Sequence, residues 1–221
     1  HVREYFALPV TRQDVQSTWS GLRPLVFDSK ASDTAKLSRD HVVNVSESGL
    51  LTIAGGKWTT YRKMSLDAVN QAIALGNLKP THAGAQTETI KLVGGKNYEP
   101  DGAAKWVHNY GISETTADHL QRAYGDRTPD VMAIAQDGYE SPLAAEHPYL
   151  EAEVIYGARH EGACTAVDIL ARRTRLGFLD SAAATRAIPR VVELLGNELE
   201  WTASQREQHH KDAVNYFANN V

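Results

Sequence analysis

The sequence predicts an α+β chain that is mostly helical. Two runs of branched apolar residues, 42–45 and 50–54, are joined by a short Ser-Gly turn, which is typical of a β-hairpin. From residue 113 onward, helix-capping signals recur ahead of apolar residues at helical spacing. The composition changes between residues 81 and 100, which indicates a mixed α/β part followed by a helical bundle.

Composition limits the classes of function. The chain has 221 residues, 42% hydrophobic and 23% charged, so it can bury a sizeable core. Its formal net charge of −4 argues against a general nucleic-acid binder, and no apolar run reaches the roughly 20 residues of a membrane span. The only cysteine, Cys164, excludes an intramolecular disulfide and is expected to be a buried, inert thiol.

The first elements are short. Thr11 with Asp14 resembles a capping pattern, so 14–19 is predicted to be a short helix. Pro24 forces Arg23 into an extended conformation ahead of a strand-like run, 25–27. Arg23 is placed either to point into a cleft or to lie on the surface with a solvated head.

The hairpin places charged residues beside a glycine pair. In an antiparallel pair, the start of one strand lies beside the end of the other. Arg39 and His41, at the start of the first strand, are therefore expected next to Gly55 and Gly56, at the end of the second. Clustered cations at a helix start have little structural purpose unless an anion binds there. We therefore expect Arg39, His41 and Lys57 to converge on one pocket, with Arg23 a further candidate.

A strand, a glycine turn and a helix start meet between residues 50 and 62. Gly55 and Gly56 permit a sharp turn, and Thr59 and Thr60 stand where the N-cap of the next helix belongs. Free backbone N–H groups and a helix dipole, with Lys57 beside them, suit a phosphate, a carboxylate or an electron-rich cofactor edge. An ordinary connection whose glycines only permit close packing is the alternative.

The remaining elements follow from local signals. The first long helix is expected to end near Gly76-Asn77, a C-cap pair. The run 88–93 alternates enough to predict one more strand. Further helices are expected over 113–124, from 128, over 151–160 and 165–176, from 181 (bent or broken at Pro189 and closed by Gly196), and from 202.

Other candidate sites are weak. The basic run 172–175 is expected to be a solvated helix face, with contact to anionic lipid as the minority interpretation. His209 and His210 are adjacent and point in different directions on a helix, and His160 has only Glu161 beside it, so no metal site is predicted.

Five long motifs resemble one family. They are SGLRPLV at 20–26, SRDHVV at 38–43, SGLLTIAGGKWTTYR at 48–62, ACTAVD at 163–168 and RRTRL at 172–176. Together they are similar to the FAD-dependent glycerol-3-phosphate dehydrogenases, and most similar to the mitochondrial type. The resemblance runs through the chain and implies that these residues are the C-terminal portion of such an enzyme. Residues 1–82 would be the last strands and helix of an FAD and substrate domain, and 83–221 the helical C-terminal domain.

The resemblance implies roles for particular residues. Arg23 and Arg39 would hold the substrate phosphate. Lys57 would lie at the flavin–substrate junction, and Gly55, Gly56, Thr59 and Thr60 would hold the pyrimidine end of the flavin. His41 is a reserve candidate for the proton acceptor, which is otherwise expected in the N-terminal half.

The implied reaction oxidises sn-glycerol 3-phosphate to dihydroxyacetone phosphate by hydride transfer to FAD, with electrons passed to ubiquinone. The implied partner is the N-terminal FAD-binding half, and the implied location is the intermembrane-space side of the mitochondrial inner membrane, peripherally attached, with a homodimer left open. A related oxidase that uses oxygen is one alternative. A non-catalytic helical binding module is the other, and the isolated chain is expected to be inactive.

Overall fold

The computed structural model describes residues 5, 7–22, 26, 40–82 and 84–220. The chain divides into two compact units, which we call the hairpin unit (Gly21–Lys91) and the helical unit (His1–Ser20 with Leu92–Val221). The first segment of the chain therefore belongs with the helices that follow residue 92. The predicted domain boundary after residue 82 stays a prediction.

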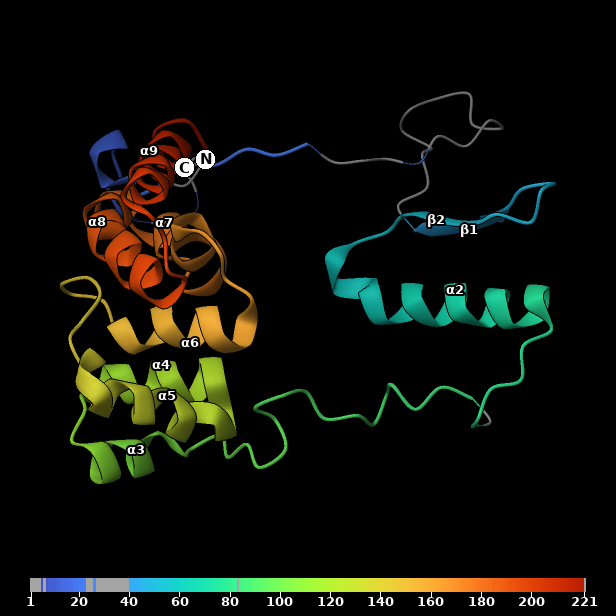
Figure 1. Ribbon diagram of the computed structural model, residues 1–221, viewed down its shortest axis with the longest axis horizontal. Coiled ribbons are helices and arrows are strands. Elements are labelled where there is room, and N and C mark those ends of the chain that lie inside the picture. Colours follow the sequence, from blue (N-terminus) through green and yellow to red (C-terminus); the bar gives the residue numbers. More distant parts are fainter. Residues whose placement is uncertain (1–4, 6, 23–25, 27–39, 83, 221) are drawn as a thin grey trace. The chain divides into compact units, whose positions relative to one another are not determined.

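The hairpin unit contains the predicted antiparallel pair. Strands β1 (His41–Val45) and β2 (Leu51–Gly55) pair with His41 opposite Gly55 and Val45 opposite Leu51. A 3₁₀ turn, η3 (Trp58–Thr60), then leads into helix α2 (Tyr61–Gly76), which packs on the hairpin (Figure 1). Asn77 ends α2 in the left-handed conformation, as the Gly-Asn pair predicted.

The hairpin unit has no fully buried residue in β1, β2 or α2. Alternate strand residues are half-buried, and Leu50, Val69 and Leu75 are at least half exposed. Two strands and one helix are too few to enclose apolar side chains on all sides. The hairpin and α2 therefore leave apolar side chains exposed.

The helical unit is built from short and long helices. After η1 (Arg12–Asp14) they are α3 (Ala103–Tyr110), α4 (Glu114–Tyr124), η4 (Gly125–Arg127), α5 (Thr128–Ile134), η5 (Ala135–Tyr139), α6 (Glu151–Glu161), η6 (Asp168–Arg173), α7 (Leu176–Leu179), α8 (Ser181–Glu198) and α9 (Ala203–Asn220). Helix α6 packs against α5 and α8, and α8 packs against α9 (Figure 1). A mostly helical chain with a two-stranded sheet confirms the predicted fold class.

Local capping explains where the helices begin. The Ser113 hydroxyl accepts a hydrogen bond from the Thr116 amide at 3.1 Å at the start of α4. Thr202 and Gln205 exchange hydrogen bonds at the start of α9, which confirms the predicted capping box. These ends depend on neighbours in sequence, so the sequence predicted them well.

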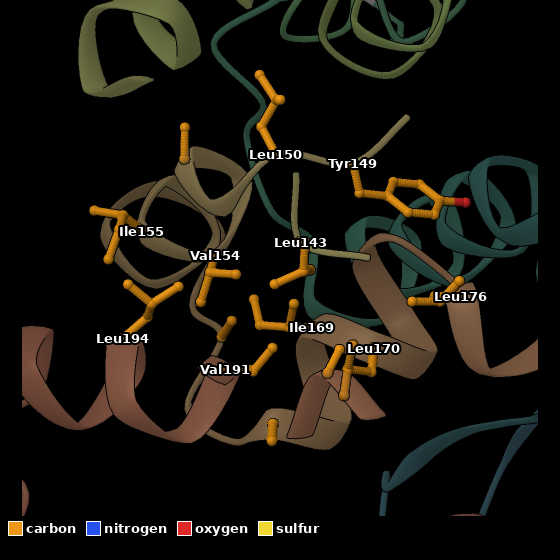
Figure 2. Close-up of a cluster of buried hydrophobic side chains, with 14 of the residues drawn as sticks. Leu143, Tyr149, Leu150, Val154, Ile155, Ile169, Leu170, Leu176, Val191 and Leu194 are labelled. Carbon is orange, nitrogen blue, oxygen red and sulfur yellow. The ribbon is translucent and has the colours of Figure 1, made fainter. Parts of the chain in front are cut away.

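The core lies among α5, α6, η6 and α8. Figure 2 shows side chains of α6, η6 and α8 gathered together, with Val154 and Ile155 of α6 facing Val191 and Leu194 of α8. Ile169, at the centre, is fully buried. Burying side chains of this size contributes about 1.5–3 kcal/mol each, so this layer stabilises the helical unit.

Two predicted boundaries are wrong, and of the two alternatives predicted at Pro189, a bend or a break, the break is excluded. Thr11 does pair with Asp14, but only a three-residue 3₁₀ helix forms and Val15 is extended, because the chain then bonds to the start of α8. Helix α8 continues through Pro189 and Gly196, because its buried face packs along its whole length. Gly196 instead allows the Arg206 guanidinium to approach and donate to the Glu193 carbonyl at 3.1 Å.

Other expectations are also corrected. The run 88–93 forms turns rather than a strand, because no described segment pairs with it and its apolar side chains stay exposed. The helix expected over 165–176 is split at Arg175 into a π-helix, η6, and α7. Helix α3 was not predicted. Cys164 is exposed, not buried, because it lies in the turn between α6 and η6, where its amide bonds to Asp168.

Candidate functional site

The glycine turn at the end of β2 is the centre of the candidate site. Gly55 and Gly56 have φ of +77° and +78°, a conformation that favours glycine. A Cβ on Gly55 would lie 2.6 Å from Val26 Cγ2, and one on Gly56 would lie 2.6 Å from Met64 Sδ. Both glycines are therefore required by backbone conformation and by close packing.

The turn releases the next four residues to the surface. Lys57, Thr59 and Thr60 are exposed. The Thr60 hydroxyl accepts a hydrogen bond from the Lys57 amide at 3.2 Å and donates to the Lys57 carbonyl at 2.9 Å. Thr60 is the N-cap residue of α2, as its position predicted, but its side chain closes the 3₁₀ turn ahead of the helix and accepts no hydrogen bond from α2.

The register of the hairpin brings His41 to the turn. His41 stands opposite Gly55, and its Cβ is 3.2 Å from the position that a Cβ on Gly56 would take. Its Nε2 lies 2.9 Å from Asp67 Oδ2 on α2, and Lys63 Nζ lies 2.6 Å from the other oxygen of Asp67. The Lys63 hydrogen bond, and secondarily His41, hold the pKa of Asp67 below its usual value.

Asp67 is a site residue that the sequence did not reveal. It follows Lys63 by four residues, a helical spacing that predicts an ion pair on α2 but gives no reason to connect it with His41. The link spans 26 residues and depends on how α2 packs on the hairpin. Such a pairing becomes visible only when the strand and the helix are placed together.

An exposed aromatic pair flanks the turn and was also missed. Trp58 is 87% exposed and Tyr61 is 52% exposed, with ring centroids 5.9 Å apart. Large exposed aromatic side chains next to a candidate site favour contact with a further molecule or a further part of the protein. The tryptophan within the motif at 48–62 is the feature of the sequence that could have indicated this aromatic pair.

Only some of the cations predicted to share one pocket lie among the described residues. His41 and the glycine turn are brought together, and Lys57 lies beside them on the surface. Arg23 and Arg39 lie outside the described residues. Lys57 has an exposed ammonium and Thr59 an exposed hydroxyl, so the chemistry of these donors fits an anionic or electron-rich edge of a cofactor.

The described residues offer neither a metal site nor a membrane-spanning helix. Within the described ranges, no group of three or more His, Cys, Asp or Glu side chains could hold a metal ion. In the same part of the chain, no helix is long and apolar enough to cross a membrane.

Comparison with known proteins identifies the family. Residues 85–206 match the family model of the C-terminal domain of alpha-glycerophosphate oxidase. This match covers more than half of the chain, so the chain belongs to that family. The family resemblance expected from the sequence motifs is thereby confirmed.

The relatives extend the match to the hairpin unit. The chain is 48% identical over 225 residues to the mitochondrial glycerol-3-phosphate dehydrogenase of Bos taurus and 47% identical to that of Homo sapiens. It is 44% identical to the mitochondrial glycerol-3-phosphate dehydrogenase SDP6 of Arabidopsis thaliana. Each alignment covers 98% of this chain but only 30% of the mammalian proteins and 37% of the plant protein. The chain therefore spans about a third of the length of these relatives.

A solved structure matches the fold. The X-ray structure of glycerol-3-phosphate dehydrogenase from Bacillus halodurans, complexed with FAD, superposes with a TM-score of 0.73 at 27% sequence identity. The match covers 97% of this chain and 42% of that one. Both units of the chain thus have counterparts in a flavoprotein.

Proposed function

We propose that this chain is part of a flavoprotein that oxidises sn-glycerol 3-phosphate to dihydroxyacetone phosphate. The structural observation that carries the proposal is the pairing of His41 with Gly55, which gathers a histidine, a glycine turn and Lys57 at one end of the hairpin. The similarity to dehydrogenases across 98% of the chain supports the same activity.

The residues at the turn would hold one edge of the flavin. Exposed Lys57 supplies a positive charge, and the backbone around Gly55, Gly56, Thr59 and Thr60 supplies hydrogen-bonding groups at the start of a helix. A fixed cation at this edge stabilises negative charge without reorganisation during the reaction. FAD, when bound, supplies the chemistry of hydride acceptance.

Two arginines would bind the substrate. Arg23 and Arg39, in the motifs SGLRPLV and SRDHVV, are proposed to hold the phosphate, because the planar guanidinium donates paired hydrogen bonds to phosphate oxygens. This contact would fix the carbon chain of the substrate relative to the glycine turn. His41, oriented by Asp67, is the reserve candidate for accepting the hydroxyl proton of the substrate.

The location and partners follow from the same relatives. Their names support a mitochondrial location. We further propose peripheral attachment to the intermembrane-space side of the inner membrane, electron transfer to ubiquinone, and an N-terminal FAD-binding half in the same protein. The exposed apolar surface of the hairpin unit supports the last point, since a larger domain would bury it. A homodimer is compatible with the proposal.

One observation favours a second candidate. The matching family model takes its description from an oxidase, the alpha-glycerophosphate oxidase. Transfer of electrons to oxygen is therefore the alternative activity. The described site residues do not distinguish the two electron acceptors. The similarity to the mitochondrial dehydrogenases supports the first.

The test begins with flavin in the intact protein. The purified protein is denatured and centrifuged, and FAD is measured in the supernatant; we expect one FAD per chain. Glycerol 3-phosphate is then supplied with a quinone analogue without oxygen, or with oxygen alone. Turnover with the quinone analogue supports the dehydrogenase, and hydrogen peroxide formation supports the oxidase. A flavin-free protein, or a flavin that the substrate does not reduce, would contradict the proposal.

The 221-residue chain by itself provides the comparison. It lacks the glycine-rich motif that binds the adenine nucleotide in this family, so its FAD affinity is expected to be very weak. Stoichiometric FAD on this chain alone would contradict the assignment of the nucleotide contacts to another half. That outcome would favour a self-sufficient flavin domain.

A further inference from the structure

The helical unit contains a large open cavity that the proposed function does not use. Its volume is about 850 Å³, and it is lined by residues of α4, of α7 and of the segments before and between helices. Trp19, Tyr149 and Phe178 supply an aromatic lining. Trp19 and Phe178 meet edge to face, with ring centroids 6.3 Å apart, although Trp19 is 70% exposed. Trp19 and Phe178 are therefore open to solvent, whereas Tyr149 is buried.

The segment that carries Trp19 is anchored although Trp19 itself is exposed. The Ser17 hydroxyl donates to the Phe178 carbonyl at 2.7 Å. The Ser181 amide and hydroxyl both donate to the Gln16 carbonyl, at 3.2 and 3.1 Å. These bonds join parts of the chain more than 160 residues apart and hold the segment before Trp19 against α7 and α8. Three tertiary hydrogen bonds thus position a tryptophan that buries little of its own surface.

Three arginines line the same cavity. They are Arg122 of α4, Arg173 at the end of η6, and Arg175 between η6 and α7. Arg122 pairs with Asp118 at 3.4 Å on the exposed surface, and Arg173 pairs with Glu161, which does not line the cavity. Asp118 is the only carboxylate among the described lining residues, and once Glu161 is also counted, the three arginines exceed the carboxylates paired with them by one charge.

Arg175 has no ion pair and no side-chain hydrogen bond with any described residue. Its φ is +57°, the left-handed region that a residue with a Cβ rarely adopts. The preceding Thr174 is buried, and its hydroxyl donates to the Ile169 carbonyl at 3.0 Å, which fixes this turn. The π-helix η6 lies just before it. Strained backbone and π-helical turns cluster at functional sites.

The buried acid Glu153 lies behind a histidine of the cavity wall. Glu153 is 2% exposed and lies behind His119, whose Nε2 is 2.7 Å from the carboxylate. The Tyr124 hydroxyl and the Leu150 amide also donate to Glu153, each at 2.9 Å. Its charge is therefore satisfied inside the core, and His119 separates it from the cavity that His119 lines.

We propose that this cavity binds a phosphate ester that carries an aromatic or other apolar group. The phosphate would bind Arg175, Arg173 and Arg122, because guanidinium groups match phosphate in charge and geometry. The apolar group would contact Trp19, Tyr149 and Phe178, where burial and stacking add affinity. All lining residues of the cavity belong to the helical unit, so the test of this proposal does not depend on the flavin proposal.

The probe is 1-naphthyl phosphate, titrated into the 221-residue chain by calorimetry. Inorganic phosphate lacks the aromatic group and 1-naphthol lacks the phosphate, so both should bind at least tenfold more weakly than 1-naphthyl phosphate. Arg175→Gln removes the charge that has no ion pair among the described residues and should weaken the probe about tenfold, the usual effect of losing a charge-assisted hydrogen bond. Arg122→Gln tests the opposite element of the cavity and should weaken it as well. Arg186→Gln, an exposed arginine of α8 outside the lining, is the matched control.

Vesicles identify the source of the ester. Sedimentation with phosphatidylglycerol vesicles that depends on Arg175 would identify a lipid headgroup as the source. Binding of the soluble probe without such sedimentation would identify a free ester. Phosphatidylcholine vesicles control for general adsorption.

Three outcomes would overturn the proposal. They are an absence of binding by both the probe and the vesicles, equal weakening by Arg186→Gln and Arg175→Gln, and equal affinity for 1-naphthol and 1-naphthyl phosphate. Thermal unfolding of each variant, unchanged from the parent chain, confirms that a lost affinity reflects the site.

Discussion

His41 of β1 and Asp67 of α2 are joined by a 2.9 Å contact that ties the hairpin to the helix packed on it. The same contact fixes the His41 ring at the end of the hairpin where the glycine turn begins. His41 can therefore serve as a structural link, as a proton acceptor oriented by a carboxylate, or as both. The following predictions distinguish such roles.

Asp67→Asn separates the two roles of His41. We expect the intact protein to lose thermal stability while the pH dependence of kcat/KM stays in place, because the carboxylate mainly holds the helix to the hairpin. Lys63→Gln, which leaves His41 and Asp67 in contact, is the control. A shift of the acidic limb of the pH profile, where a catalytic base takes up its proton, toward lower pH in Asp67→Asn would instead identify His41 as the base.

Lys57→Ala tests the cation at the turn. We expect the rate of flavin reduction by substrate, measured by stopped flow on the intact protein, to fall more than FAD retention, because the charge stabilises the reduced flavin. Lys79→Ala, an exposed lysine beyond the C-terminal end of α2, is the matched control. Normal reduction kinetics in Lys57→Ala would remove this role.

Arg39→Ala tests the phosphate contact. A charge-assisted hydrogen bond contributes about 1.5–3 kcal/mol, so we expect KM for glycerol 3-phosphate to rise tenfold or more. Steady-state kinetics of the intact protein measure this, and Arg12→Ala serves as a control for loss of charge elsewhere. An unchanged KM would exclude Arg39 from the substrate site.

Asp180→Ala tests the N-cap of α8. Asp180 Oδ1 accepts a hydrogen bond from the Ala183 amide at 2.8 Å, so its loss should cost about 1 kcal/mol in urea unfolding. This hydrogen bond, and secondarily His147, lower the pKa of Asp180 below 3.8. The ionised carboxylate therefore stabilises the fold fully above pH 3.8, and this stabilisation is lost as the pH falls through the lower folded pKa.

Asp180→Asn is the matched control, because the amide oxygen can still accept the bond while the charge is absent. It should retain most of the stability at neutral pH and lose the acid dependence that belongs to Asp180. Equal destabilisation by Asn and Ala would show that the charge, rather than the cap hydrogen bond, is responsible.

Gly177→Ala tests the contact between α7 and α9. A Cβ at Gly177 would overlap the Phe217 ring, and Gly177 does not need a positive φ, so the effect is one of packing. We expect a loss of about 1–3 kcal/mol by chemical denaturation. Adding Phe217→Leu to Gly177→Ala should recover part of that loss relative to the sum of the single variants. Strict additivity would show that the two residues do not share this space.

The sequence by itself determined what depends on neighbours along the chain. Ser113 and Thr202 with Gln205 predicted helix starts, and the Ser-Gly turn predicted the hairpin that sets His41 beside Gly55. The long motifs predicted the family. These signals succeed because capping and turn hydrogen bonds are closed within a few residues.

Only the tertiary structure decided the features that join distant segments. Asp67 reaches His41 because α2 packs on the hairpin, and α8 runs through Pro189 because a buried face outweighs the loss of one helical hydrogen bond. The run 88–93 alternates like a strand but has no partner strand among the described residues. Local pattern sets what a segment can form, and the free energy of packing between segments decides which form is kept.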